Sequence, residues 1–158
     1  KMRNHGLRNR DEVELWGYNS RLDAIQAAIV NIRLKHLPEW ILRIRAIAEY
    51  YRKNLADLVL VPKDKPHEFA AYHTFIIQTD RRDELQQWLL SQGVETKIHY
   101  PIPIHLQEAA RDLGYKEGDF PVTERQVKRI LSLPIYQELT EEQLVIVVAE
   151  IRAFFAEH

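Results

Sequence analysis

A helical repeat of apolar residues, interrupted by one proline, constrains the fold of this chain more than any other feature. Between residues 22 and 58, apolar side chains recur every three or four positions, which is the spacing of one helix face. Pro38 falls within the repeat, and proline removes a helical N–H and disfavours helix in the residue before it. The sequence therefore predicts two helices, or one kinked helix, over residues 20–57.

A loop signal precedes this repeat, because Gly17, Asn19 and Ser20 stand close together. Ser20 followed by Asp23 places an acceptor at the N-cap and a carboxylate on the first turn of a helix. The first turn of a helix leaves backbone N–H groups without an intrahelical partner. Asn19 and Arg21 therefore lie where a polar or anionic ligand could bind, although a capped helix with a solvated Arg21 explains the same spacing.

Short apolar runs and helical repeats follow one another after residue 58. The expected strands cover residues 58–61, 70–79, 94–100 and 132–135. The expected helices cover residues 80–93, 105–113, 123–131 and 140–158. Helices and strands are segregated rather than strictly alternating, which predicts an α+β fold: a small antiparallel-type sheet covered by helices on one side.

Composition excludes several kinds of site and partner. The formal net charge of −1 lacks the basic excess that nucleic acids and membrane surfaces select, so neither is expected as a partner. The chain has no cysteine, which excludes disulfides, thiolate metal sites and cysteine nucleophiles. No apolar run is long enough to span a bilayer, and the first residues lack a secretory signal, so we expect a cytoplasmic protein.

Histidines gather in one proline-rich stretch, residues 98–105. Here His99, Tyr100 and His105 could line a cleft whose shape the prolines hold, or the histidines could simply bond to backbone. Their spacing matches no metal signature, and no metal site is predicted. His73 lies within an apolar run and is interpreted as a hydrogen-bonded core histidine. Glycine-rich nucleotide loops and a serine-hydrolase motif are absent, and no lysine has the surroundings of a Schiff-base lysine.

Motifs spread over nearly the whole chain carry a family resemblance. They are Arg3-Asn4-His5-Gly6, residues 17–23 with Gln26-Ala27-Ala28, Tyr72-His73, residues 96–101 with Pro103-Ile104-His105, residues 119–124, and residues 131–136 with Leu139-Thr140. In this order they resemble the C-terminal part of the DegT/DnrJ/EryC1/StrS sugar aminotransferases.

The resemblance implies a fold, a cofactor and a division of the chain. Members of this family resemble aspartate aminotransferase (fold type I), form dimers and use pyridoxal 5′-phosphate (PLP), and their PLP-binding lysine and aspartate lie upstream of the matched part. Residues 1–19 would link from a missing large domain, residues 20–57 would form the long or kinked helix pair, and residues 58–158 would form the small C-terminal α+β domain. The chain would then hold no catalytic residue, bind no PLP alone and be inactive alone.

The resemblance also assigns site residues. Asn19 matches an asparagine that reaches the PLP phosphate of the other subunit, and a phosphate there would suit a helix N-terminus. Arg21 matches the arginine two residues further on, which is either structural or near the same phosphate. His99, Tyr100 and His105 match the loop that borders the sugar-nucleotide site.

The implied reaction transfers an amino group from an amino acid such as glutamate to a keto sugar nucleotide, in a homodimer. Two alternatives stay open: a regulatory or interaction domain of a DegT-like pleiotropic regulator, and a PLP-dependent sugar dehydratase in which histidine replaces the lysine.

Overall fold

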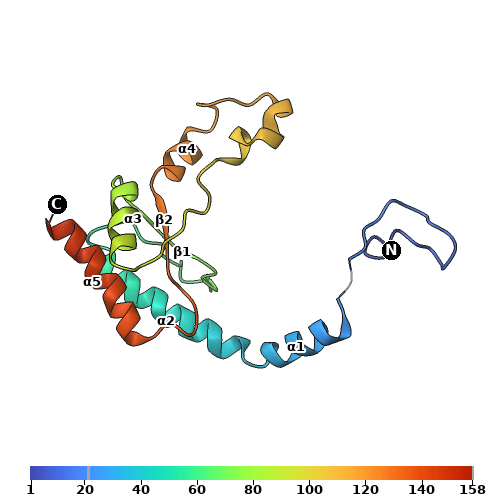
Figure 1. The fold of residues 1–158 in the computed structure, drawn as a ribbon, viewed down its shortest axis with the longest axis horizontal. Coiled ribbons are helices and arrows are strands. Elements are labelled where there is room, and N and C mark those ends of the chain that lie inside the picture. The colour runs from blue at the N-terminus through green and yellow to red at the C-terminus, as the bar shows by residue number, and fades with distance from the viewer. Residues whose placement is uncertain (21, 158) are drawn as a thin grey trace. The chain divides into compact units, whose positions relative to one another are not determined.

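The computed structural model describes residues 1–20 and 22–157, and Figure 1 labels its helices and strands. The α-helices in this part of the chain are α1 (Ala24–Leu34), α2 (Leu37–Leu55), α3 (Arg82–Ser91), α4 (Pro121–Val127) and α5 (Glu141–Glu157). The strands are β1 (Phe75–Gln78) and β2 (Ile130–Leu133), and the 3-10 helices are η1 (Ile104–Leu106) and η2 (Glu108–Leu113). The chain divides into two compact units, Lys1–Glu39 and Trp40–His158.

The first unit begins with a loop, residues 1–20, that folds back on itself. His5 donates its backbone N–H to the Tyr18 carbonyl (3.0 Å), which joins the two ends of the loop. Gly6 has a φ of 75°, and a Cβ atom there would lie 1.6 Å from the Leu15 carbonyl oxygen. Only glycine fits this close approach of two backbone segments.

Helix α1 begins after the position that the sequence predicts. The N-cap is Asp23 rather than Ser20, and the Asp23 backbone N–H donates to the Gln26 side-chain oxygen (3.2 Å). Ser20 instead donates its N–H to the Arg3 carbonyl (2.9 Å) and therefore belongs to the loop. The predicted Ser20 cap is wrong, because the loop already uses the Ser20 backbone.

The helical repeat divides near Pro38, since α1 ends at Leu34 and α2 begins at Leu37. Pro38 is the second residue of α2, where a helix offers the backbone N–H no intrahelical partner, so the missing donor costs little. None of the helices in the described part of the chain combines the length and the apolar character that crossing a membrane requires.

The sheet of the second unit consists of β1 and β2, paired antiparallel. Phe75 lies opposite Leu133, and Ile77 lies opposite Leu131. Leu131 is expected at the end of a helix, but α4 ends at Val127 and the chain then turns into β2. The small antiparallel sheet of an α+β fold is confirmed.

Two further strands expected from the sequence are reduced to single bridges at the two edges of this sheet. Leu60 pairs with Gln78 at one edge, and Lys97 pairs with Ser132 at the other. A proline follows each of these segments and cannot donate a backbone hydrogen bond to a ladder, which limits how far the pairing extends.

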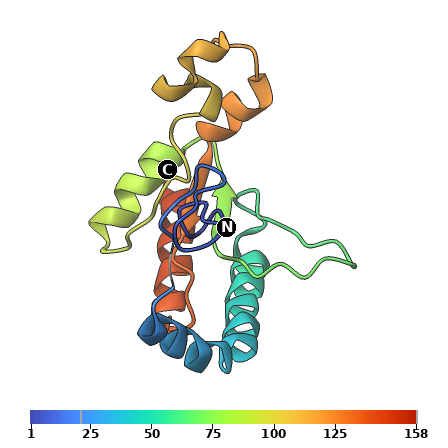
Figure 2. The same ribbon diagram turned by 90° about the vertical axis from the view of Figure 1, so that its right-hand side faces the viewer.

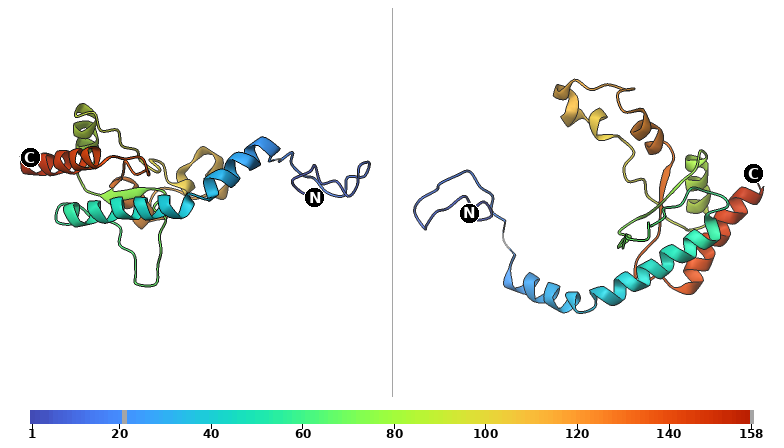
Figure 3. Two further views of the ribbon diagram at one scale, coloured as in Figure 1. Left: turned by 90° about the horizontal axis from the view of Figure 1, so that it is seen from below. Right: turned by 180° about the vertical axis from the view of Figure 1, so that it is seen from behind.

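The core lies between the sheet and helices α2, α3 and α5. Helices α2 and α5 run alongside each other (Figures 2 and 3), and arginines tie them at both ends. Arg43 donates to Glu141 (2.6 Å) near their beginnings, and Arg152 donates to the Asn54 carbonyl (2.7 Å) near their ends. The side chains at the centre of the core are Ile47, Tyr51 and Leu55 of α2, Phe75 and Ile77 of β1, Leu85 and Leu89 of α3, Leu131 of β2, and Leu144 and Ile151 of α5.

Residues 98–129 leave the sheet and return to it as a lobe that contains η1, η2 and α4. In Figures 1 and 2 this lobe projects from the sheet on the side away from α2 and α5. Ala110 is the one buried residue in this range, all of which the structure describes. The lobe therefore has almost no hydrophobic core of its own.

Candidate functional site

The residues that resemble cofactor-binding positions lie at the end of the first unit's loop. Asn19 is exposed and forms an isolated antiparallel bridge with Asn4. A surface depression beside this bridge is lined by Lys1, Met2, Arg3, Asn4 and Ser20. Arg21, the other predicted cofactor residue, lies outside the described residues.

The groups around this depression suit an anion. Asn19 offers amide donors and Arg3 offers a guanidinium, both exposed, whereas the Lys1 ammonium already pairs with Glu14. Helix α1 begins only at Ala24, so Asn19 does not stand at its first turn. An anion here would meet side-chain donors of the loop rather than the helix N-terminus that the sequence suggests.

The second unit presents a polar face of the sheet, opposite the core. Ser132 lies between Leu131 and Leu133, which face the core, so its side chain points the other way. Lys97 pairs with Ser132, and directly paired residues of an antiparallel sheet share a face. His99 follows two residues later, and its Nδ1 lies 2.8 Å from the Ser132 hydroxyl. The predicted site residue His99 is therefore fixed against the sheet.

A cavity of about 170 Å³ opens on this polar face. Its lining combines imidazoles, an amine, a carboxylate and hydroxyls: His73, Thr74, Glu95, Lys97, His99 and Ser132, with Leu133, Pro134 and Ile135. The ion pair with Lys97 holds the pKa of Glu95 below its usual range. These groups can donate hydrogen bonds to a hydroxylated ligand and accept them from it.

His73 is exposed, so its interpretation as a core histidine is wrong. The neighbouring Tyr72 is buried instead. Strand β1 begins only at Phe75, so its alternation of buried and exposed side chains does not extend back to His73. Sequence reasoning missed His73, Lys97 and Ser132 as site residues. The alternation of residues 95, 97 and 99 is the signal that could have found Lys97.

The remaining predicted substrate residues, Tyr100 and His105, differ in exposure. Tyr100 is 71% exposed. The His105 side chain is 8% exposed, and its Nε2 lies 2.9 Å from Glu124 Oε1. His99 and His105 are thus held by different partners, one in β2 and one in α4. No cluster of three or more metal-ligating side chains occurs in the described part of the chain.

Glu124 binds more groups than His99, Tyr100 or His105, the site residues predicted in this region. Its carboxylate accepts the backbone N–H groups of Gly118 (2.9 and 3.0 Å) and Phe120 (3.2 Å) as well as the His105 contact. The Gly118 N–H, followed by His105 and Phe120, holds the pKa of Glu124 below its usual range. An ionised carboxylate only accepts, so His105 Nε2 is the donor. Glu124 lies four residues after the N-cap Phe120, one position beyond that of a capping-box glutamate, so the usual helix-start signal does not identify this role.

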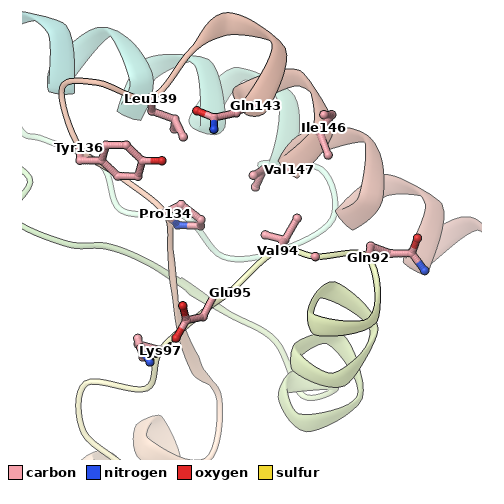
Figure 4. Close-up of a pocket in the computed structure, with 11 residues that line it drawn as sticks. Gln92, Val94, Glu95, Lys97, Pro134, Tyr136, Leu139, Gln143, Ile146 and Val147 are labelled. Atoms are coloured by element: carbon pink, nitrogen blue, oxygen red, sulfur yellow. Dashed lines mark hydrogen bonds and ion pairs between the residues drawn. The ribbon is translucent and has the colours of Figure 1, made fainter.

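A second cavity, of about 540 Å³, lies between α5 and the segment that follows α3 (Figure 4). Its lining residues are Gln92, Gly93, Val94, Glu95, Lys97, Pro134, Tyr136, Leu139, Gln143, Ile146 and Val147. It shares Glu95, Lys97 and Pro134 with the smaller cavity, so the two cavities meet at the same edge of the sheet. No feature noted in the sequence predicts this cavity.

Comparison with known proteins gives the same family along nearly all of the chain. A family model for the DegT/DnrJ/EryC1/StrS aminotransferase family matches residues 1–152. A pleiotropic regulatory protein of Geobacillus stearothermophilus is 41% identical over 158 residues, which cover 98% of this chain and 42% of that protein. The dTDP-3-amino-3,4,6-trideoxy-alpha-D-glucose transaminase of Streptomyces venezuelae is 39% identical over 153 residues, covering 96% and 40%.

A solved structure agrees with these sequence relatives. The crystal structure of S. venezuelae DesV in complex with a ketimine intermediate superposes with a TM-score of 0.91 at 39% identity, covering 97% of this chain and 42% of that one. This chain spans about two fifths of the length of the relatives that it matches. It belongs to the DegT/DnrJ/EryC1/StrS aminotransferase family.

Proposed function

We propose that this chain forms part of a PLP-dependent nucleotide-sugar aminotransferase, which moves an amino group from an amino acid such as glutamate to a keto sugar nucleotide. The family match over residues 1–152, with a sugar transaminase among the relatives at 39% identity, carries the proposal. The lysine that binds PLP belongs to a part of the protein outside this chain, and the chain alone is inactive.

The same proposal gives each part of the chain a place in a homodimer. Residues 1–19 link from the large domain, residues 20–57 form the connecting helices, and residues 58–158 form the small C-terminal domain of a fold-type I enzyme. The α+β architecture, with a small antiparallel sheet covered by helices, supports this division.

The loop of the first unit fits the phosphate end of PLP. Asn19 and Arg21 would bind that phosphate in the partner subunit, and the exposed Arg3 guanidinium adds a second type of donor beside Asn19. PLP supplies the electron sink for transamination when it is bound. The contribution of this chain is to bind and orient the phosphate.

The polar face of the sheet and the lobe above it would border the sugar nucleotide. His99, fixed by Ser132, and the exposed Tyr100 present hydrogen-bonding groups to a hydroxylated substrate, and His105 belongs to the same loop. Lys97 adds a cation on the face that His99 occupies.

The experiment compares this chain with a longer protein that carries it together with the aminotransferase large domain. Added PLP should give the visible absorption band of a lysine-bound cofactor with the longer protein and none with residues 1–158. Conversion of glutamate to 2-oxoglutarate should depend on a keto sugar nucleotide. A lysine-bound PLP band from residues 1–158 alone would contradict the proposal.

A second candidate is a regulatory or interaction domain, which the relative named as a pleiotropic regulatory protein favours. Salt-sensitive binding of the chain to duplex DNA would support it, although the net charge of −1 offers little attraction to phosphates. A sugar dehydratase on the same scaffold is the third candidate. Histidine at the position of the PLP-binding lysine would identify it.

A further inference from the structure

Two imidazole contacts connect the outgoing and returning halves of the 98–129 lobe. His99 contacts Ser132 at the base (2.8 Å), and His105 contacts Glu124 farther out (2.9 Å). The residues of each pair lie far apart along the chain. Each contact therefore closes a long loop, which has an entropic cost that the bonds must offset.

The lobe depends on these contacts because it buries so little apolar surface. Ala110 is its one buried residue, and segments with few buried apolar contacts open at low free-energy cost. The Glu124 carboxylate joins three separate parts of the lobe: the turn at Gly118, the start of α4 at Phe120, and His105 in η1. The Phe120 ring packs beside the His105 ring, with centroids 4.7 Å apart and the rings tilted by 51°, and the paired side chains of His105 and Glu124 are mostly enclosed.

Taking the proposed function as its basis, we infer that Glu124 and His105 are positioning residues, which hold the lobe so that the exposed Tyr100 meets the sugar nucleotide. The His105 imidazole is mostly enclosed, and its Nε2 is already committed to Glu124. Tyr100, between His99 and His105, is the exposed hydrogen-bonding side chain of this segment, since its other exposed large side chains, Ile102 and Ile104, are apolar. Its position depends on both imidazole contacts.

The first test needs no enzymatic activity. Hydrogen exchange of residues 1–158 is compared for wild type, Glu124→Ala, Glu124→Gln and Glu117→Ala, where Glu117 is an exposed carboxylate in the same lobe. Glu124→Ala should abolish protection at Gly118 and in η1 while α2 and α5 keep theirs. Glu124→Gln keeps an accepting oxygen and should retain most protection. Unchanged exchange in Glu124→Ala would overturn the inference.

The second test uses the longer aminotransferase that carries this chain. His105→Ala and Glu124→Ala should each raise KM for the sugar nucleotide, by up to about a hundredfold, with a much smaller change in kcat. The double variant should be no worse than either single one, because both break the same contact. His105→Gln places an amide donor where Nε2 was and should restore KM, whereas His105→Phe should not.

A direct substrate contact by His105 predicts a different pattern. His105→Gln would then be as impaired as His105→Ala, Glu124→Ala would be nearly silent, and the inference would be wrong. Absence of transamination by the wild-type protein would count against the proposed function instead, and the exchange experiment would still decide the role of Glu124.

Discussion

Tyr72 shows how one side chain can connect a loop to a helix. Its φ is 47°, in the left-handed region that residues other than glycine seldom adopt. Its hydroxyl accepts a hydrogen bond from Arg52 Nη2 (2.6 Å) and donates one to Asp64, which also binds Arg45 (3.0 Å). Burial, and then the bond to Asp64, raises the pKa of Tyr72, so the phenol keeps the proton that it donates.

Removing this hydroxyl should destabilise the second unit. Tyr72→Phe leaves Arg52 and Asp64 without their shared partner, and we expect the free energy of unfolding to fall by about 1–3 kcal/mol in urea denaturation. Tyr18→Phe removes an exposed hydroxyl and should change it by less than about 0.5 kcal/mol. Equal effects of the two variants would show that the hydrogen bonds of the Tyr72 hydroxyl do not stabilise the folded state.

Glu124 should make the lobe sensitive to acid. The Gly118 N–H, then His105 and Phe120, lowers the pKa of Glu124 in the folded state, so its stabilising effect is full above the ordinary glutamate pKa of about 4.3. That contribution is lost as the pH falls through the lowered folded pKa. Protection of the lobe's amides, relative to the intrinsic exchange rate at each pH, should therefore fall steeply below about pH 4 in wild type.

The control for this prediction is Glu124→Gln, which has no carboxylate to protonate. Its lobe should lack the acid-dependent step, although other carboxylates still titrate throughout the chain. An equally steep loss of protection in Glu124→Gln would assign the acid sensitivity to those other groups.

At the residue scale, the sequence shows local motifs but not the contacts between residues that are distant along the chain. The stretch with His99, Tyr100 and His105 is visible as a string of histidines and prolines. The partners Ser132 and Glu124 are not, because they approach these histidines only after the lobe has folded back. His73 is exposed because β1 begins only at Phe75, so the apolar run before it does not continue the strand.

At the scale of elements, α3 offers a matched pair of leucines. Leu89 is fully buried in the core, and the next residue, Leu90, is 64% exposed. Leu89→Ala should lower the free energy of unfolding by about 2–5 kcal/mol, through lost burial and the cavity that it leaves. Leu90→Ala should change it by less than about 0.5 kcal/mol, because helix propensity and surface position change little.

Thermal or urea unfolding of the two variants checks this prediction. Both substitutions remove the same atoms from the same helix, so the difference between them isolates the burial of one leucine. Similar losses for both variants would mean that the exposed side of α3 is covered in solution.

The beginning of α5 was predicted well, whereas that of α1 was not. The helix expected from residue 140 is confirmed as α5, and a capping box opens it, since Thr140 N donates to Gln143 (3.0 Å) and Gln143 N donates to Thr140 (3.2 Å). The edge strands were not, because their pairing depends on neighbours and on the prolines that follow them. The α+β fold class holds without those edge strands, because β1 and β2 already form the antiparallel sheet.

At the scale of the whole molecule, the two units differ in how much tertiary packing supports them. Helix α1 has 11 residues and none of them is buried, whereas α2, α3 and α5 all contribute to the core. An isolated helix shorter than about 12–15 residues is marginal in water. We expect the amides of α1 to exchange within seconds in this chain, and those of α2 and α5 far more slowly.

Hydrogen exchange followed by mass spectrometry measures this directly. Slow exchange of α1 that speeds up on dilution would reveal self-association through its apolar residues, and slow exchange at every concentration would contradict the prediction.

The bridge between Lys97 and Ser132 has a consequence for how such proteins diversify. The lobe leaves the sheet and rejoins it at one pair of facing residues, so its insertion points already stand side by side. A loop of another length or sequence can replace it without a change in the register of β1 and β2. The lobe can therefore be exchanged for a different one while β1 and β2 keep their pairing.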